Sequence, residues 1–358
     1  MKIHNFNAGP ASLPESVLKE ASNAILNFEN SGLSILEIAH RSPEFKAVLD
    51  EAKDLTLDIL DLKDKEYQVL FLQGGARMEF LRIPMNLMKQ NGKAAFLDTG
   101  IWSSGAMKEA EAFGLCVEVA SSKDRKYCYL PTEYSVPEDA DYFYCTSNNT
   151  ISGTQITNFP KTEIPVVCDM TSDLFSRSLD FSKFDLIFAA AQKNIGIAGV
   201  TLLVVKESIL GKSNRNIAPI LDFQQHIKAD NMYNTPAVFA IYTAMLTLRW
   251  IKAQGGVLAI EKRNQEKARL LYEEIDRNTL FEGTVDQKDR SMMNAIFILK
   301  NENQKDSFDQ FLNERGIYGL EGHRFVGGYR ASLYNAVSVE SVKYLVHVLQ
   351  EFEKQNIN

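Results

Sequence analysis

The sequence predicts an α/β protein in which a large domain, built on a mostly parallel sheet between helices, precedes a smaller C-terminal α/β domain. Between about residues 66 and 206, short apolar runs alternate with amphipathic or turn-rich stretches. The runs are apolar on both faces and mostly rich in β-branched and aromatic residues, which is typical of strands buried between two helix layers. Ligands of such sheets bind in the crevice beyond the carboxyl ends of the strands.

The expected strands of the large domain lie at residues 69–72, 94–97, 142–145, 166–168, 186–189 and 201–205. After them, Asn234-Thr235-Pro236 predicts a helix start, with Thr235 as the cap and Pro236 at the first helical position. This helix runs towards Trp250, and Gly255-Gly256 ends it.

The C-terminal part shows its own periodic pattern. We expect a helix at about 257–277, a strand at 294–299, a helix near 304–315, a glycine-rich stretch at 316–328 and a last helix at about 338–354 with one apolar face. The expected division is an N-terminal segment 1–15, a large domain 16–255 and a small domain 256–358.

Composition narrows the class of protein. The chain has 358 residues, 45% of them apolar, and a net charge of −7, so it is neither disordered nor a general ligand for nucleic acid or an anionic membrane. No apolar run approaches the roughly 20 residues of a membrane span, and the N-terminus lacks the apolar core of a signal peptide. The four cysteines have no CxxC spacing, which argues against a zinc site. We expect a cytoplasmic protein with two domains and no metal.

Two polar residues stand at the ends of apolar runs in the expected sheet. Lys193 follows the run 186–189, and Asp169 follows the run 166–168. A buried lysine has a lowered pKa, which suits an amine that forms a Schiff base. A pyridoxal phosphate (PLP) enzyme needs this lysine, together with a carboxylate that keeps the pyridine nitrogen protonated. Taken singly, a lysine that snorkels from a strand end and an aspartate that caps a turn remain open alternatives.

The surrounding motifs resemble one family over essentially the whole chain. The matching stretches are Asn7-Ala-Gly-Pro10, His40-Arg41, Gly74-Gly-Ala-Arg77, Ala191-Gln-Lys-Asn-Ile-Gly196, Asn234-Thr-Pro236 and Gly322-His-Arg-Phe-Val-Gly-Gly-Tyr-Arg-Ala-Ser-Leu-Tyr-Asn335. They resemble the phosphoserine aminotransferases, which are class V, fold type I PLP enzymes. The resemblance implies PLP fold type I for this chain.

The resemblance also implies how PLP is held. Lys193 would form the Schiff base and Asp169 would pair with the pyridinium nitrogen. The other implied cofactor contacts are stacking by Trp102, a hydrogen bond from Thr150 beside the phenolic oxygen, and phosphate contacts from Ala76, Arg77 and Gln192. Asn234 and Thr235 would reach the phosphate from the neighbouring subunit, which implies a homodimer with shared active sites. Without the family, core packing would explain Trp102 as well, and a plain helix cap would explain Thr235.

The substrates implied by the resemblance each carry an α-carboxylate and a distal anionic group. Arg330 would bind the α-carboxylate, and His40, Arg41, Arg77, His323 and Arg324 would form the pocket for the distal group. Any one of these arginines alone could equally be a surface ion pair. The implied reaction is reversible amino transfer between L-glutamate and 3-phosphohydroxypyruvate, which gives O-phospho-L-serine and 2-oxoglutarate. A phosphorylated hydroxythreonine of pyridoxine synthesis is a second substrate that the family accepts.

Three positions depart from the common family pattern. Ala8 stands where serine is frequent, Ala76 replaces a glycine of the phosphate loop, and Met170-Thr-Ser172 follows Asp169 where small hydroxyl residues usually come directly. None of these changes removes a group that performs chemistry.

Three other classes of protein fit the sequence less well than an aminotransferase. A catalytically silent PLP-fold binding protein would be free to lose Lys193, Asp169 and the cationic residues, and all are present. A cysteine desulfurase needs a mobile cysteine, usually late in the chain, and no cysteine follows Cys168. A nicotinamide dehydrogenase would need a GxGxxG motif that opens a βαβ unit, and the sequence has none.

Overall fold

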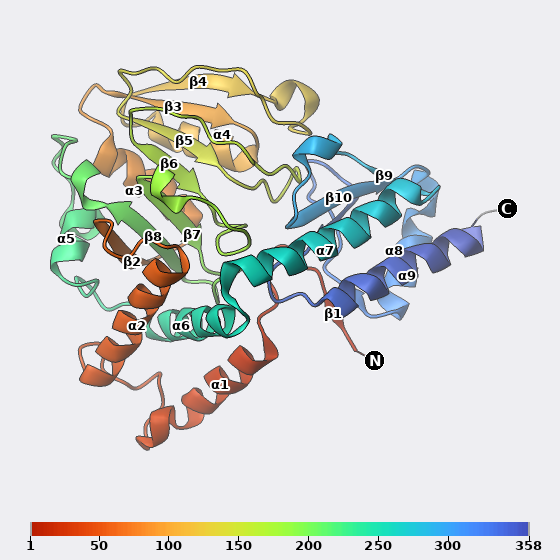
Figure 1. The fold of residues 1–358 in the computed structure, drawn as a ribbon, viewed down its shortest axis with the longest axis horizontal. Coiled ribbons are helices and arrows are strands. Elements are labelled where there is room, and N and C mark those ends of the chain that lie inside the picture. The colour runs from red at the N-terminus through yellow and green to blue at the C-terminus, as the bar shows by residue number, and fades with distance from the viewer. Residues whose placement is uncertain (1, 357–358) are drawn as a thin grey trace.

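The computed structural model describes residues 2–356 and contains a seven-stranded sheet, seen at the left of Figure 1. The strands lie in the order β2-β8-β7-β6-β5-β3-β4. Their bounds are Tyr67–Gln73 (β2), Lys93–Asp98 (β3), Leu115–Ser121 (β4), Tyr142–Thr146 (β5), Val166–Asp169 (β6), Leu186–Ala190 (β7) and Val200–Lys206 (β8). Strand β8 is antiparallel to β2 and β7, and the other neighbouring pairs are parallel. The predicted mostly parallel sheet and its six predicted strands are confirmed.

Strand β4 has no counterpart among the predicted strands. It lies at the edge of the sheet beside β3, and its side chains are exposed or half-buried along its whole length. Leu115, at its start, is 62% exposed. An edge strand does not need residues that are apolar on both faces, so it lacks the continuous apolar run by which the central strands are recognised.

Helices cover both faces of the sheet because successive side chains of a strand point to opposite sides. In β2, Phe71 packs in the same core cluster as Ile241, whereas its neighbour Leu70 packs in a second cluster with Phe80. The helices of the first face are α1 (Glu15–Leu26), α2 (Pro43–Ile59) and α6 (Val238–Ala253). Those of the second face are α3 (Ala76–Leu87), α4 (Ile101–Ala110) and α5 (Phe223–Lys228).

The C-terminal part forms a smaller α/β unit, drawn in blue at the right of Figure 1. Its antiparallel sheet has the order β12-β10-β9. The elements are α7 (Gly256–Arg277), β9 (Phe281–Gly283), β10 (Asn294–Leu299), α8 (Lys305–Glu314), β12 (Tyr329–Ser332) and α9 (Val339–Asn356). They agree with the predicted strand and the three predicted helices.

The N-terminal segment belongs with this smaller unit. Strand β1 (His4–Asn5) pairs in parallel with β11 (Ile317–Tyr318), which lies in the glycine-rich stretch. Phe6 is buried in a core cluster whose other residues lie beyond residue 256. This separate core supports a domain division at residue 255, which remains a proposal.

The predicted start of α6 was wrong by a short distance. The helix begins at Val238, and Thr235 makes no capping hydrogen bond to it. Instead, Asn234 Nδ2 donates to Gln73 Oε1 at 2.9 Å, and Gln73 Nε2 donates to the Thr235 carbonyl at 2.8 Å. These bonds hold the segment before the helix against the end of β2, and this tertiary contact overrides the local helix-start signal.

No helix in the part of the chain that the structure describes is long and apolar enough to cross a membrane.

Candidate active site

The carboxyl ends of β6 and β7 bring Asp169 and Lys193 together. Asp169 is the last residue of β6, and Lys193 lies in the turn that follows β7. The two strands are parallel neighbours, and both side chains are buried. Each charge acts on the pKa of the other group. Neighbouring strands therefore bring a carboxylate and a lysine to the same edge of the sheet, as the sequence predicts.

Lys193 is buried, and within residues 2–356 its amine has one hydrogen-bond partner. Its Nζ donates to Thr150 Oγ1 at 2.6 Å. Burial lowers the pKa of the Lys193 ammonium to about 8, although the charge of Asp169 opposes this effect. The amine is therefore partly neutral near physiological pH, which suits a nucleophile and a proton carrier.

Asp169 is a buried carboxylate. Burial raises its pKa, and the hydrogen bonds of Thr171 and the charge of Lys193 oppose that rise. The Thr171 backbone N–H donates to Asp169 Oδ1 at 2.8 Å, and Ser172 Oγ donates to the Asn148 carbonyl at 2.7 Å. In the segment that departs from the family pattern, Thr171 therefore bonds the carboxylate directly, and Ser172 ties the segment to the neighbouring loop.

Two helices begin directly after strands of the same sheet, α3 after β2 and α4 after β3. Helix α3 begins at Ala76, and no side chain in the described part of the chain caps its first turn. The Met78 N–H donates to the Gly75 carbonyl at 2.8 Å, so the N–H groups of Ala76 and Arg77 are the ones available to an anion. Trp102 lies in the first turn of α4, and the Arg77 guanidinium is 5.8 Å from the centroid of its ring. The buried Trp102 Nε1 has no hydrogen-bond partner among the described residues.

A hollow of about 670 Å³ in the small domain collects three of the residues predicted to bind the anionic groups of the substrate. Arg330, His323 and Arg324 line it, together with Asn7. Arg330 Nη1 donates to the Thr150 carbonyl at 3.4 Å, and its buried Nε has no partner among the described residues. Thr150 also accepts from Lys193, so this one residue contacts both Arg330 and the lysine.

The other predicted site residues of this chain lie elsewhere. His40 and Thr235 line a separate hollow of about 440 Å³, and Arg41 follows His40 in an exposed position. Asn234 is held at the end of β2 by Gln73. A single chain therefore does not gather all the predicted phosphate and substrate contacts into one pocket.

The N-terminal segment contributes contacts that the sequence analysis did not assign. A Cβ placed on Gly9 would lie 3.7 Å from Lys193 Cγ, so its backbone lies against the lysine side chain. The Ala11 N–H donates to the Gln192 carbonyl at 2.9 Å, and Tyr334 OH donates to the Ala8 carbonyl at 2.9 Å. Tyr334 and Ala8 belong to motifs that the sequence analysis identified, but their residue types do not indicate that they contact each other.

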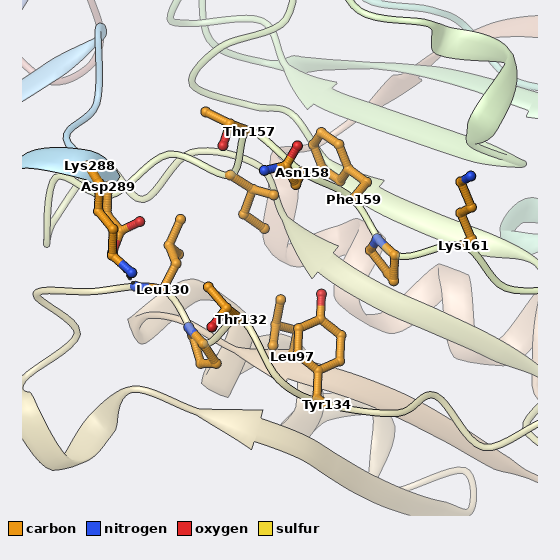
Figure 2. A pocket seen from close by; sticks show the side chains of 13 residues that line it. Leu97, Leu130, Thr132, Tyr134, Thr157, Asn158, Phe159, Lys161, Lys288 and Asp289 are labelled. Carbon is orange, nitrogen blue, oxygen red and sulfur yellow. Dashed lines mark hydrogen bonds between the residues drawn. The ribbon is translucent and has the colours of Figure 1, made fainter.

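Figure 2 shows another hollow, of about 530 Å³, that contains none of the predicted site residues. Leu97 and Tyr134 lie near its centre, and Lys161 and Lys288 lie at opposite ends of it (Figure 2). The carboxylate of Asp289 is already occupied, because Oδ2 accepts from the Leu130 N–H at 3.0 Å. The chemistry of the candidate site does not extend to this hollow.

The donor set of the site fits pyridoxal phosphate. A lysine of lowered pKa and a carboxylate lie together, an uncapped helix N-terminus offers N–H groups, and an aromatic ring stands at the start of the next helix. Trp102 Nε1 and Arg330 Nε are buried donors without an acceptor among the described residues, and a bound cofactor or substrate could supply one. These are the groups that an aldehyde, a pyridine nitrogen, a phosphate and a substrate carboxylate require.

Comparisons with known proteins agree with this fit. The pattern of the family "Aminotransferase class-V" matches residues 3–345. A phosphoserine aminotransferase of Flavobacterium psychrophilum is 60% identical over 99% of this chain and 100% of its own. The solved phosphoserine aminotransferase of Bacillus circulans subsp. alkalophilus is 39% identical, with a TM-score of 0.96 and 99% of both chains covered. The PLP-bound enzyme of Trichomonas vaginalis is 33% identical, with a TM-score of 0.93 over 98% of this chain and 100% of its own.

These likenesses extend over nearly the full length of both partners. They confirm PLP fold type I for this chain, and they identify it as a PLP-dependent transaminase. The chain belongs to the class-V aminotransferases and, within them, to the phosphoserine aminotransferase family.

Proposed function

We propose that this protein transfers the amino group of L-glutamate to 3-phosphohydroxypyruvate, reversibly, to give O-phospho-L-serine and 2-oxoglutarate. The observation that carries the proposal is the buried Lys193, which contacts Thr150 while the Thr150 carbonyl accepts from Arg330. Thr150 thus contacts both an amine that can transfer protons and a guanidinium that can bind a carboxylate. Serine biosynthesis is the role that such a reaction serves.

Pyridoxal phosphate, when bound, supplies the electron-withdrawing ring that makes the Cα–H bond of the substrate acidic. Lys193 would hold it through Nζ and, once released, carry the proton to and from the substrate Cα. Asp169 would keep the pyridine nitrogen protonated, and Thr150 would donate beside the ring oxygen. Trp102 would stack on the ring. The N-terminus of α3 at Ala76 and Arg77, with Gln192, would bind the phosphate.

Substrate recognition follows from the charge of the small-domain hollow. Arg330 is suited to the α-carboxylate because its planar guanidinium can form two parallel hydrogen bonds. His323, Arg324 and Arg77 would bind the distal anionic group. Phosphoserine and glutamate each carry both groups, so one set of anion-binding residues can serve both halves of the reaction. The same argument admits 4-phosphohydroxythreonine as a further substrate, which would link the protein to pyridoxine biosynthesis.

We further propose a homodimer whose subunits share their active sites. His40 and Thr235 line a hollow separate from Arg330, and Arg41 and Asn234 stand next to them in the sequence. Leu36 also lines this hollow and is 61% exposed. A second copy that covers this face would bury it and would bring these four polar residues to the partner's site.

A cytoplasmic location is consistent with the thiols. Cys145 and Cys168 are free, and their sulfur atoms lie 3.6 Å apart on neighbouring strands. Such a pair of reduced thiols suits a reducing compartment.

Two rival functions are less well supported. A cysteine desulfurase would require a cysteine near Lys193, and none of the cysteines lies late in the chain. A silent binding protein has no need of a lysine whose pKa is lowered to about 8.

The test is a coupled assay of 2-oxoglutarate amination by phosphoserine, compared between the wild type and Arg330→Ala. Loss of a charge-assisted, bidentate contact costs about 2–3 kcal/mol, so the variant should raise the KM for phosphoserine roughly 30- to 150-fold. Lysine-bound cofactor should persist in the variant. A wild type that does not aminate 2-oxoglutarate from phosphoserine would refute the proposed substrates.

A further inference from the structure

Tyr127 is a buried aromatic residue with strained backbone geometry. Its φ is +64°, in the left-handed region that bulky residues rarely adopt. Its hydroxyl donates to Asp98 Oδ2 at 3.1 Å and lies 2.9 Å from Ser104 Oγ. Its backbone N–H donates to the Ser122 carbonyl at 2.9 Å. The strain is therefore held in place by several contacts, which is common for residues that orient a functional site.

The hydroxyl of Tyr127 is anchored to the start of α4. Asp98 ends β3, and Ser104 belongs to the same helix turn as Trp102. The Asp98 carboxylate also accepts from Ser104 Oγ at 2.6 Å and from Ser121 Oγ at 3.0 Å. Tyr127 is thus fixed to the element that carries the proposed stacking residue.

The ring of Tyr127 contacts the loop at residues 322–328. Its centroid lies 6.2 Å from that of Phe325, with an interplanar angle of 36°. Phe325 lies at the tip of this loop, which is closed by hydrogen bonds from the Gly322 N–H to the Gly328 carbonyl and from the Gly327 N–H to the His323 carbonyl. Phe325 is 44% exposed. The aromatic pair therefore joins a small-domain loop to the large domain.

The backbone of Phe325 also fixes the tautomer of His323. The Phe325 N–H donates to His323 Nδ1 at 3.2 Å, so Nδ1 is an acceptor and the neutral ring carries its proton on Nε2. Burial, and then the charges of Arg330 and Arg324, lower the pKa of His323. The neutral imidazole consequently presents an N–H donor beside the Arg324 guanidinium.

We propose that Tyr127 and Phe325 are positioning residues that dock the loop 322–328 so that His323 and Arg324 meet the distal anionic group of the substrate. The inference rests on the proposed function, because it assumes a substrate with such a group. Neither residue touches the substrate in this account. They determine which substrates the enzyme accepts, because they hold His323 and Arg324 in place.

The test compares phosphoserine with alanine as amino donors. Alanine has the α-carboxylate that Arg330 binds but no distal anion, so a correctly docked loop matters for phosphoserine alone. The variants are Phe325→Ala and Tyr127→Phe, with Phe325→Tyr as the conservative rescue. Leu258→Ala, at a 65% exposed position on α7, is the matched control. Calorimetric titration of each PLP-loaded protein with inorganic phosphate adds a readout that does not depend on turnover.

For Phe325→Ala we expect a rise in KM for phosphoserine on the order of tenfold, with kcat at saturation and kcat/KM for alanine unchanged. Phosphate binding should weaken by a similar factor, Phe325→Tyr should restore both values, and Leu258→Ala should match the wild type. Tyr127→Phe should act in the same direction and more weakly.

Equal losses for phosphoserine and alanine, or a Phe325→Ala variant that matches the wild type on phosphoserine, would overturn the inference. If Tyr127→Phe fails to fold, Phe325→Ala and its rescue decide alone. A wild type with no activity on phosphoserine would instead refute the proposed function, so the two failures are distinguishable.

Discussion

At the scale of single residues, burial prepares Lys193 for its chemistry. An ammonium in this position loses its water, keeps one hydrogen bond to Thr150, and has its pKa lowered to about 8. Asp169 limits the shift, since its carboxylate favours the charged lysine. The balance between these two effects leaves an amine that can accept and release a proton near neutral pH.

The rate of cofactor attachment to Lys193 should therefore follow the neutral amine. Below the pKa of the lysine, each pH unit changes the neutral fraction about tenfold, so the rate constant should rise with pH and level off above about pH 8. Stopped-flow absorbance of the cofactor-free protein mixed with PLP measures it. Lys193→Ala serves as the control and should give no lysine-bound band. A rate that still rises steeply between pH 9 and pH 10 would contradict the lowered pKa.

At the scale of elements, α7 holds the segment that follows β12 through a second buried lysine. Lys267 Nζ donates to the carbonyls of Leu333 and Tyr334 at 2.7 and 2.8 Å. These residues follow β12, which carries Arg330, and the next residue, Asn335, donates its N–H to Asn194 Oδ1 at 3.0 Å. The helix thus supports the segment that links Arg330 to the neighbour of Lys193.

Lys267 should make the stability of the protein depend on pH. Burial lowers its pKa to about 7, against 10.5 for an unperturbed lysine. Between these values the unfolded chain binds a proton that the folded chain does not, so the free energy of unfolding should rise with pH by about 1.4 kcal/mol per unit. Below pH 7 both states are protonated and the cost of burial is constant.

Urea unfolding of the wild type and Lys267→Met at pH 6, 7, 8 and 9 measures this slope. The difference in free energy of unfolding between the two proteins should stay nearly constant from pH 6 to 7. Above pH 7 the free energy of unfolding of the wild type should rise relative to that of Lys267→Met. Lys262→Met, at an exposed position of the same helix, should leave the pH dependence unchanged. Parallel curves for the wild type and Lys267→Met would show that Lys267 keeps an ordinary pKa.

The elements that the sequence predicted are those whose pattern is set by burial. The central strands are apolar on both faces and were placed correctly, whereas β4 was missed because its edge position leaves it half-exposed. The start of α6 was misplaced because Gln73, distant in sequence, holds Asn234 and Thr235. A long-range hydrogen bond leaves no local signal in the sequence.

In the candidate site, too, residues placed by the local pattern could be predicted and residues placed by long-range contacts could not. Lys193 and Asp169 could be found from strand ends alone, since parallel strands align their carboxyl ends. The contacts of Gly9 and Tyr334 depend on how the N-terminal segment crosses the small domain, and no periodicity encodes that path. The separation of His40 from Arg330 is likewise a property of the folded chain.

At the scale of the whole molecule, the split site gives the proposed homodimer a direct test. If His40 and Arg41 serve the partner's site, a dimer of one Lys193→Ala chain and one His40→Ala/Arg41→Ala chain contains one intact site. Random mixing makes half of the dimers mixed, so about a quarter of the wild-type sites should return.

The two variants should be co-expressed and assayed at low phosphoserine concentration. Each variant alone should be inactive or nearly so under these conditions, and the mixture should recover activity. If His40 and Arg41 act within their own chain, every site in the mixed dimers stays defective, and the absence of recovery would contradict the shared site.

The central claim is that Lys193 holds PLP in a site that accepts phosphoserine and glutamate. Its most direct test is the absorption spectrum of the purified protein with PLP, recorded before and after each amino acid is added, beside Lys193→Ala. We predict a lysine-bound band that both amino acids convert to the band of the aminated cofactor, and no such band in the variant. Without a lysine-bound band in the wild type after PLP is added, or with a band that phosphoserine leaves unchanged, the claim fails.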